Sequence, residues 1–247
     1  MDKKTNWQEY QAIIEQQGIT KLYHFTDRDN LQSIIQNGGL YSWADCEEKG
    51  ISIAKPGGSD SSRSLDARDG LQRYVRVSFV TQHPMMYVAM NEGRISNPVL
   101  LEIDPQVIYW KDSKYADRNA TKNGARVGGD VEDFKAIHFS SVKVLKHFDL
   151  DDEEQKFYQA EVLVKNFIPL EYIKNIGNFG IPIPNKPKVL QSKMAYTAQI
   201  TRNTPTAFIF LVDHSVSMNK TTSLFGEDMT MAEAAARIVN RQINELV

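Results

Sequence analysis

The alternation of hydrophobic and polar positions predicts β-strands in several parts of the chain. Residues 74–80 alternate most cleanly: Val75, Val77 and Phe79 share an inward face, and Tyr74, Arg76 and Ser78 share the outward face. Residues 21–25 and 98–103 are two further short strands on the same reasoning. A continuous apolar run over residues 207–212 predicts a buried parallel strand.

Apolar residues at helical spacing predict two helices near the start of the chain. Residues 5–17 carry Trp7, Tyr10, Ile13 and Ile14 on one side, and Gly18 ends this helix. Residues 26–29 resemble a capping box that opens a second helix, which stops at Gly38-Gly39. Residues 170–176 form a short helical piece, and another helix opens at residue 230. The polar stretches 41–70 and 111–133 predict two long loops, which are usually functional when they occur in a compact domain.

One acidic residue lies inside a strongly apolar stretch near residue 160. In residues 157–164, Ala160, Val162 and Val164 fall on one face of the predicted strand, and Gln159, Glu161 and Leu163 fall on the other. A buried carboxylate is costly unless it has partners or a task. Glu161 is therefore either a sheet-edge residue that faces water or a functional acid, with the amide of Gln159 beside it.

Composition and charge are those of an ordinary globular protein. The chain has 247 residues, of which 41% are hydrophobic and 24% charged, and its net charge is −2. No global basic field indicates nucleic-acid binding, so any such site must be a local patch. The single cysteine, Cys46, excludes an internal disulfide framework and a cysteine-based zinc cluster. Without a long apolar run or a leader-like start, we expect no membrane contact and a cytoplasmic location.

The chain resembles the DarT-type ADP-ribosyltransferases through five short segments. They are Leu22-Tyr-His-Phe-Thr26 with the helix after it, Ser62-Arg-Ser-Leu-Asp66 leading into Tyr74-Val-Arg-Val-Ser-Phe79, His83-Pro-Met-Met-Tyr87, Asp117-Arg-Asn-Ala120 and Gln159-Ala-Glu-Val-Leu-Val164. Each segment is a weak signal alone, but their order and spacing over residues 20–176 make the joint match specific. The family often has a histidine where Asn119 stands and an arginine shortly before the acid, where this chain has Gln155 and Lys156. These departures bear on the target base and on the choice between DNA and RNA.

The resemblance implies an α+β fold and an NAD⁺-dependent activity. The expected architecture is an ADP-ribosyltransferase-like split antiparallel β-sheet with flanking helices and with NAD⁺ in its cleft. The expected domains are a DarT-like domain at 1–178, a proline-rich linker at 179–205 and a further segment at 206–247. Members of this family attach ADP-ribose from NAD⁺ to bases in single-stranded DNA, so a bacterial toxin or anti-phage role is implied, with an antitoxin as a protein partner.

Two residues are assigned to catalysis on this resemblance. Glu161 would stabilise the positive charge that develops on the ribose as the nicotinamide bond breaks. Arg63 would contact the NAD⁺ phosphates, because a guanidinium binds phosphate in a forked geometry. The alternative reading of Arg63 is a solvated loop arginine, and Arg68 is the alternative residue for this role.

The same resemblance assigns residues to the two substrates. The NAD⁺-binding residues are His24, Phe25, Thr26, Gly39, Leu40, Arg63 and Tyr74, and those that contact the nucleic acid are Arg118, Asn119, Lys122 and Gln159. Cations for phosphates and flat side chains for bases are what a single strand requires. The alternative readings are a backbone-satisfied histidine at 24, incidental charge in a solvated loop at 111–138, and a packing role for Tyr74, His83, Met85, Met86 and Tyr87.

Residues 208–218 resemble the start of a von Willebrand factor A domain. That fold begins with an apolar strand that ends in Asp-x-Ser-x-Ser, here Asp213, Ser215 and Ser217, whose oxygens would bind Mg²⁺. The later strands and loops of such a domain do not follow, so we expect an incomplete strand–helix segment of α/β type without a complete metal site. It would dock on the transferase domain, pair with another chain or be disordered.

Three functions therefore stay open on the sequence. The first is ADP-ribosyl transfer to a base in single-stranded DNA, since a base in a duplex is shielded. The second is the same chemistry on RNA or on a protein side chain. The third is a non-catalytic module whose cleft holds a nucleotide.

Overall fold

The computed structural model describes residues 1–183, 221–224 and 227–230 of the chain. The chain divides into two compact units, Met1–Pro187 and Lys188–Val247. In the second unit, β9 (Thr221–Leu224) pairs antiparallel with β10 (Glu227–Thr230). The predicted strand at 207–212, the helix from residue 230 and the predicted metal ligands Asp213, Ser215 and Ser217 lie outside the described residues.

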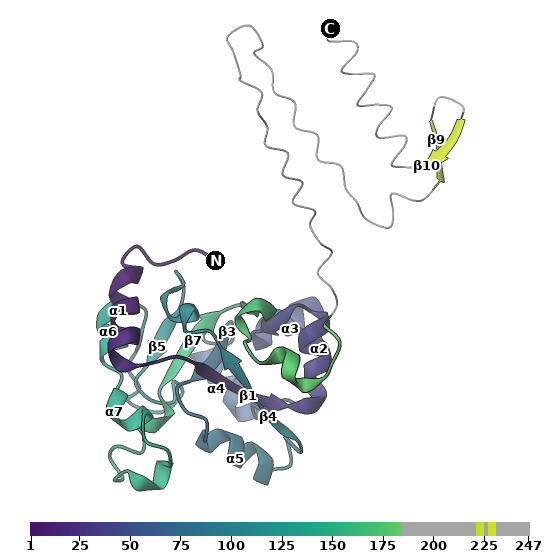
Figure 1. Ribbon diagram of the computed structural model, residues 1–247. Helices are drawn as coiled ribbons and strands as arrows, with labels where there is room; N and C mark the ends of the chain where they lie inside the picture. Colours follow the sequence, from purple (N-terminus) through teal and green to yellow (C-terminus); the bar gives the residue numbers. More distant parts are fainter. Residues whose placement is uncertain (184–220, 225–226, 231–247) are drawn as a thin grey trace, which may run out of the picture. The chain divides into compact units, whose positions relative to one another are not determined.

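The first unit is built on a six-stranded sheet with the order β4-β1-β3-β7-β5-β6 (Figure 1). The strands are β1 (Leu22–Asp27), β3 (Tyr74–Ser78), β4 (Pro98–Ile103), β5 (Lys114–Ala116), β6 (Val127–Gly128) and β7 (Glu161–Lys165). All of its pairs are antiparallel. β1 and β3 pair at a single position, where Tyr23 lies opposite Ser78. By contrast, β1 pairs with β4, and β3 with β7, along the length of the strands. The expected α+β fold with a split antiparallel sheet is thus confirmed.

A second, two-stranded sheet joins β2 (Gly39–Tyr41) to β8 (Phe167–Pro169). Gly39 has φ 153°, and a Cβ atom there would lie 2.2 Å from the carbonyl oxygen of Ile168. The Tyr41 and Phe167 rings stack with centroids 4.2 Å apart. A residue without a side chain is therefore needed at position 39 for the two backbones to approach.

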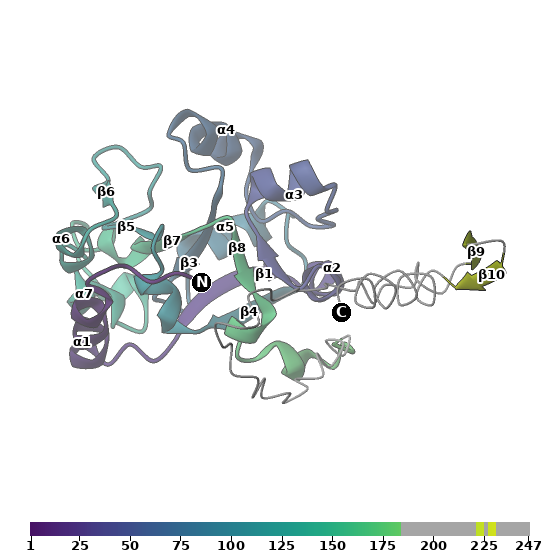
Figure 2. The ribbon, with the colours of Figure 1, turned by 90° about the horizontal axis from the view of Figure 1, so that it is seen from above.

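Seven α-helices surround the sheet of the described first unit. They are α1 (Trp7–Gln17), α2 (Leu31–Gln36), α3 (Trp43–Lys49), α4 (Asp60–Arg68), α5 (Pro84–Asn91), α6 (Val131–Lys135) and α7 (Phe139–Val142). Figures 1 and 2 show α1, α6 and α7 grouped beside β5, and α2 and α3 at the other end of the sheet. Short 3₁₀ turns connect these elements: η1 (Arg28–Asn30), η2 (Pro105–Tyr109), η3 (His147–Asp149), η4 (Phe157–Gln159), η5 (Leu170–Tyr172) and η6 (Ile176–Phe179). In the described ranges, no helix combines the length and apolar character needed to cross a membrane.

The two stretches expected to be irregular contain regular elements. α3 and α4 lie within 41–70. Their N-cap residues are Ser42 and Ser59, whose side chains accept hydrogen bonds from backbone N–H groups of the first turn. Their sequences carry no wide apolar stripe, and none of the residues of α4 is buried, which is why periodicity missed them. The stretch 111–133 contains β5, β6 and the start of α6, because β5 is completed by pairing with β7.

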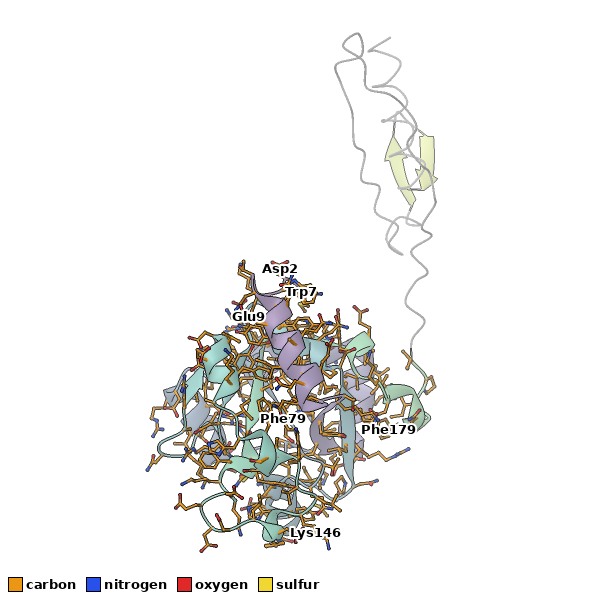
Figure 3. The ribbon with its side chains drawn as sticks, turned by 60° about the vertical axis from the view of Figure 1, so that its left-hand side comes forward. Asp2, Trp7, Glu9, Phe79, Lys146 and Phe179 are labelled. Atoms are coloured by element: carbon orange, nitrogen blue, oxygen red, sulfur yellow. The ribbon has the colours of Figure 1, made fainter. Side chains whose placement is uncertain are left out.

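The core lies on the predicted inner face of the central strands. Val75, Val77, Val162 and Val164 are at most 4% exposed, as the alternation predicts. A cluster of rings from α1, β5 and α6 (Tyr10, Tyr115 and Phe134) closes one end of the core. Figure 3 places Phe79 in the middle of the unit, with Asp2 and Lys146 toward opposite ends. The other face of β3 and β7 is also covered, since Leu163 is fully buried against Leu71, Ala116 and Ala120.

Candidate active site

A cavity of about 270 Å³ opens where β1 and β3 separate. Its walls come from residues 23–26 of β1, residues 74–78 of β3, β2, the start of α3, the 51–63 segment and the first residue of β7. Among the residues assigned from the sequence, the cavity is lined by His24, Phe25, Thr26, Gly39, Leu40, Arg63, Tyr74, Asn119 and Glu161. Segments far apart in the chain therefore meet in one concave site, which is the usual form of a small-molecule site.

Glu161 is the first residue of β7, and its side chain is 6% exposed. Its Oε2 accepts a hydrogen bond from Nη1 of Arg76 at 2.6 Å and another from the backbone N–H of Ala120 at 3.0 Å. Both bonds end on the same oxygen, so Oε1 is available to the cavity. Hydrogen bonds therefore compensate the charge of Glu161 at Oε2, while Oε1 can interact with a ligand.

Arg76 was expected on an outward face, yet it lies in the site. Because Ser78 pairs with Glu161 and Arg76 pairs with Leu163, Arg76 is the diagonal neighbour of Glu161 on the same face. Its Nη2 donates to Oδ1 of Asp66 on α4. Burial lowers the pKa of Arg76, but the two carboxylates outweigh it and the pKa is raised. Burial raises the pKa of Asp66; Arg76 opposes this effect and the charge of Glu161 adds to it.

His24 closes the gap between the separating strands. Its Nδ1 lies 2.8 Å from the carbonyl oxygen of Arg76, where a regular ladder would have a backbone hydrogen bond, and so Nδ1 carries the proton and donates. Burial lowers the pKa of this imidazole, so the ring is neutral near pH 7. The next residues hold the segment in place: Oγ1 of Thr26 accepts from Nδ2 of Asn30, which also donates to the carbonyl of Lys55.

His83 is a second histidine in the cavity wall, and only one of its two ring nitrogens has a hydrogen-bond partner among the described residues. It is 3% exposed, and its Nδ1 accepts from the N–H of Met85 at 3.2 Å. The proton of the neutral ring is therefore on Nε2, which is buried and has no hydrogen-bond partner in the described part of the chain. Burial lowers the pKa of His83 to about 4, and the charge of Arg76 contributes. A buried donor without a partner in a cavity wall is suited to a ligand acceptor.

Comparison with known proteins identifies the family. The model for "ssDNA thymidine ADP-ribosyltransferase, DarT" matches residues 23–180. The chain belongs to the DarT family. A DNA ADP-ribosyl transferase of Thermus aquaticus (strain ATCC BAA-2747 / Y51MC23) is 25% identical over 179 residues, which cover 66% of this chain and 78% of that protein. The resemblance drawn from the five sequence segments is thereby confirmed for the transferase domain.

Two solved DarT structures share the fold. Thermus sp. 2.9 DarT in complex with ADP-ribosylated ssDNA superposes with a TM-score of 0.53 at 19% identity, covering 65% of this chain and 85% of that one. Thermosipho africanus DarTG in complex with ADP-ribose gives a TM-score of 0.52 at 21% identity, covering 62% of this chain and 42% of the other. The split sheet of this chain is therefore the DarT fold.

Arg63, the arginine assigned to catalysis from the sequence, lies on α4 of this DarT domain. Nη1 of Arg63 donates to the carbonyl of Gly58 at 2.7 Å, Nη2 pairs with Asp60, and the guanidinium lies 4.2 Å from the centre of the Trp43 ring. The side chain is 24% exposed and lines the cavity. Arg68, the alternative, pairs with its neighbour Asp69, is 62% exposed and does not line the cavity.

The residues assigned to the nucleic acid divide into two groups. Asn119 lines the cavity and is buried, and its Oδ1 accepts from the N–H and the hydroxyl of Thr121. Arg118 pairs with Asp117 and lies over the Phe157 ring, and Lys122 is exposed. Gln159 was expected beside Glu161, but it belongs to the 3₁₀ turn η4 that precedes β7, and its Oε1 is buried without a hydrogen-bond partner in the described residues. None of Arg118, Lys122 and Gln159 lines the cavity.

Sequence reasoning missed Arg76, Asp66, Ala120 and His83 as parts of this site. Arg76 lies in one of the family segments, and the shared two-residue period of the strands places it on the same kind of face as Glu161 once the two strands are known to pair. Pairing and register come from the tertiary structure. Asp66 and His83 were present in the family segments, but nothing in the sequence distinguished them from solvated or packing residues.

Proposed function

We propose that this chain transfers ADP-ribose from NAD⁺ to a base in single-stranded DNA. The observation that carries the proposal is the buried carboxylate of Glu161, which has one oxygen compensated by Arg76 and the other available in the cavity. Membership in the DarT family supports the reaction type. The DarT of Thermus sp. 2.9, solved with ADP-ribosylated ssDNA, supports the choice of nucleic acid.

The residues of the cavity fit an NAD⁺ molecule. The cavity volume of about 270 Å³ is just below the range of small-molecule sites, roughly 300–1,000 Å³, so the support for NAD⁺ comes from the lining residues. The free N–H of His83 offers a donor to a carboxamide or hydroxyl oxygen. Arg63 offers a cation for the phosphates, and Tyr74 and Trp43 offer flat apolar faces. His24 shapes the wall through its backbone partner and contributes no charge.

NAD⁺ supplies the ADP-ribosyl group, with nicotinamide as the leaving group that keeps the electron pair of the broken bond. Oε1 of Glu161 faces the cavity and stabilises the positive charge that develops on the ribose. Arg76 and the N–H of Ala120 hold Oε2, so the carboxylate does not have to reorient as that charge forms. The acceptor atom of the base provides the electron pair for the new bond and loses its proton to solvent water.

The target base that we propose is thymine, in keeping with the description of the family model. Arg118, Asn119, Lys122 and Gln159 are the residues that we propose for contact with the strand. Asn119 is supported by its place in the cavity wall and by its neighbour Ala120, which binds Glu161. Modification of RNA or protein, and nucleotide binding without catalysis, are the alternatives that the experiment below distinguishes.

The biological setting that we propose is a cytoplasmic toxin or anti-phage effector controlled by an antitoxin. The toxin role follows from the chemistry, since modified bases block copying of DNA. The proposed domains are the transferase at 1–178, a linker at 179–205 and the first part of a von Willebrand factor A-like domain at 206–247. A Mg²⁺ site at Asp213, Ser215 and Ser217 would require that last domain to be complete.

The decisive experiment offers the protein NAD⁺ labelled in its adenylate part, together with single-stranded DNA, RNA or a protein pool. We expect label on single-stranded DNA, and among dA, dC, dG and dT homopolymers only on dT. Glu161→Gln is the matched control, because it keeps the size of the side chain and removes the charge. Label on RNA or protein alone would contradict the proposed substrate. Binding of NAD⁺ with neither transfer nor nicotinamide release would favour the binding module.

A further inference from the structure

One guanidinium links two acids that come from different parts of the fold. Arg76 on β3 donates through Nη1 to Glu161 on β7 and through Nη2 to Asp66 on α4. The side chains of Arg76, Glu161 and Asp66 are 22%, 6% and 18% exposed, so solvent screens these contacts only partly. All three residues line the cavity. The chain thus has a partly buried Asp66–Arg76–Glu161 bridge at its candidate active site.

The orientation of this bridge depends on both of its ends. An arginine presents its donors in a rigid planar fork, so fixing one Nη group fixes the direction of the other. Asp66 binds one branch of the fork, and the other branch then meets Oε2 of Glu161. Asp66 is itself held in place as part of α4. Its backbone carbonyl also accepts a hydrogen bond from the N–H of Leu71.

The bridge also connects α4 to the central sheet. None of the residues Asp60–Arg68 of α4 is buried, and Figure 2 shows this helix at the margin of the unit. The same helix carries Arg63 three residues before Asp66, and residues at this spacing share a helix face. The ion pair between Asp66 and Arg76 is therefore a direct contact between the helix of Arg63 and the strand next to Glu161.

We propose that Arg76 is a positioning residue, which Asp66 orients so that it holds the Glu161 carboxylate with Oε1 toward the cavity. This inference rests on the proposed function, because the position of Glu161 matters for catalysis only if Glu161 acts on the ribose. Arg76 need not touch either substrate. Its loss removes the alignment of the acid, and a misplacement of about 1 Å costs on the order of 100-fold in rate.

The test separates kcat from KM for NAD⁺ in the full chain, with the number of active sites counted by NAD⁺ binding. Arg76→Met keeps the length of the side chain and removes the fork, and we expect kcat per site to fall by about 100-fold. The KM for NAD⁺ should change by less than about threefold, because uniform binding is retained. Arg76→Lys keeps one cation without the fork and should recover about tenfold of the loss. Asp66→Asn should lower kcat by about tenfold without any change at Glu161 itself.

Arg73→Gln is the matched control. Arg73 also bridges two acids, Asp45 and Glu48, but it is 42% exposed and does not line the cavity. We expect its kcat to stay within about twofold of the parent, because exposed ion pairs contribute little. A purely structural role of Arg76 would lower the count of NAD⁺-binding sites and leave kcat per site intact, which would overturn the proposal.

Two further outcomes would overturn the inference. The first is a loss that falls entirely on KM for NAD⁺, which would make Arg76 a ligand contact. The second is parental kcat in Arg76→Lys and Asp66→Asn, which applies even if Arg76→Met does not fold. In either case an inactive Glu161→Gln variant would leave the proposed function standing. A parent protein without transfer would instead remove the proposed function, and this inference with it.

Discussion

Water hardly reaches the carboxylate of Glu161. A guanidinium and a backbone N–H both bind one of its oxygens, and these bonds compensate its charge. Glu161→Gln preserves the shape of the side chain and removes the charge that the developing positive ribose requires. We expect the transfer rate to fall by about 100- to 1,000-fold or more. NAD⁺ affinity and the circular dichroism spectrum should change little. Parental turnover in this variant would exclude Glu161 as the acid.

The two arginines of α4 differ in a way that substitution can test. Arg63 lines the cavity beside Trp43, whereas Arg68 is 62% exposed and pairs with Asp69. Arg63→Ala should therefore raise the KM for NAD⁺ and lower the transfer rate by about 100-fold, as expected for a lost phosphate contact. Arg68→Ala should stay within about twofold of the parent, since surface charges contribute little. The reverse result would move the assigned role from Arg63 to Arg68.

Protonation of His83, in the cavity wall, should make the free energy of unfolding depend on pH. Burial lowers its pKa from 6.5 to about 4, so the unfolded chain takes up a proton at a higher pH than the folded one. Its contribution to stability is complete above pH 6.5 and is lost as the pH falls from 6.5 toward 4. This loss is on the order of 3 kcal/mol. Urea unfolding at several pH values should show a shallower decline for His83→Asn, and an unchanged decline would exclude His83 as the titrating group.

At the scale of elements, the pairing of β2 with β8 depends on a position without a side chain. Gly39 has φ 153°, and a Cβ atom there would lie 2.2 Å from the backbone oxygen of Ile168. Gly39→Ala should lower the free energy of unfolding by about 2 kcal/mol. It should also raise the KM for NAD⁺, because β2 lines the cavity.

Gly177 in η6 provides the control for this substitution. A Cβ atom at Gly177 meets no atom within 4 Å, and its φ is not in the positive range. Gly177→Ala should change the free energy of unfolding by less than about 0.5 kcal/mol. Equal effects of the two substitutions in thermal or urea unfolding would contradict the account of the β2–β8 contact.

Helices and strands with their own apolar pattern could be predicted from the sequence. Those that form through contacts with other elements could not. α1 and the strands β1, β3 and β4 follow from periodicity, because each carries an apolar face into the core. α4 has no buried residue, and β5 is a three-residue strand that exists through its pairing with β7. The predicted place of Gln159 on the strand was wrong for a related reason, since Gln159 is the last residue of the turn η4 and β7 begins two residues later, at Glu161.

At the scale of the whole molecule, the lining of the cavity, as far as the structure describes the chain, comes from the unit Met1–Pro187. A chain ended after Pro187 should therefore fold alone, since a compact unit of this size supports its own core. We expect its kcat and its KM for NAD⁺ to stay within about twofold of the full chain. Loss of transfer with intact folding would instead assign a part in catalysis to the residues after 187.

The sequence alone determined the family, the strand that bears Glu161 and the segments that surround the cavity, since order, spacing and local period are properties of the chain itself. The tertiary structure decided which side chains meet. Arg76, Asp66 and Glu161 are separated by 10 and 85 positions along the chain, and they touch because β3 pairs with β7 and α4 lies against β3. A one-residue change of register would turn Arg76 to the opposite face, so the bridge depends on an arrangement that only the folded molecule specifies.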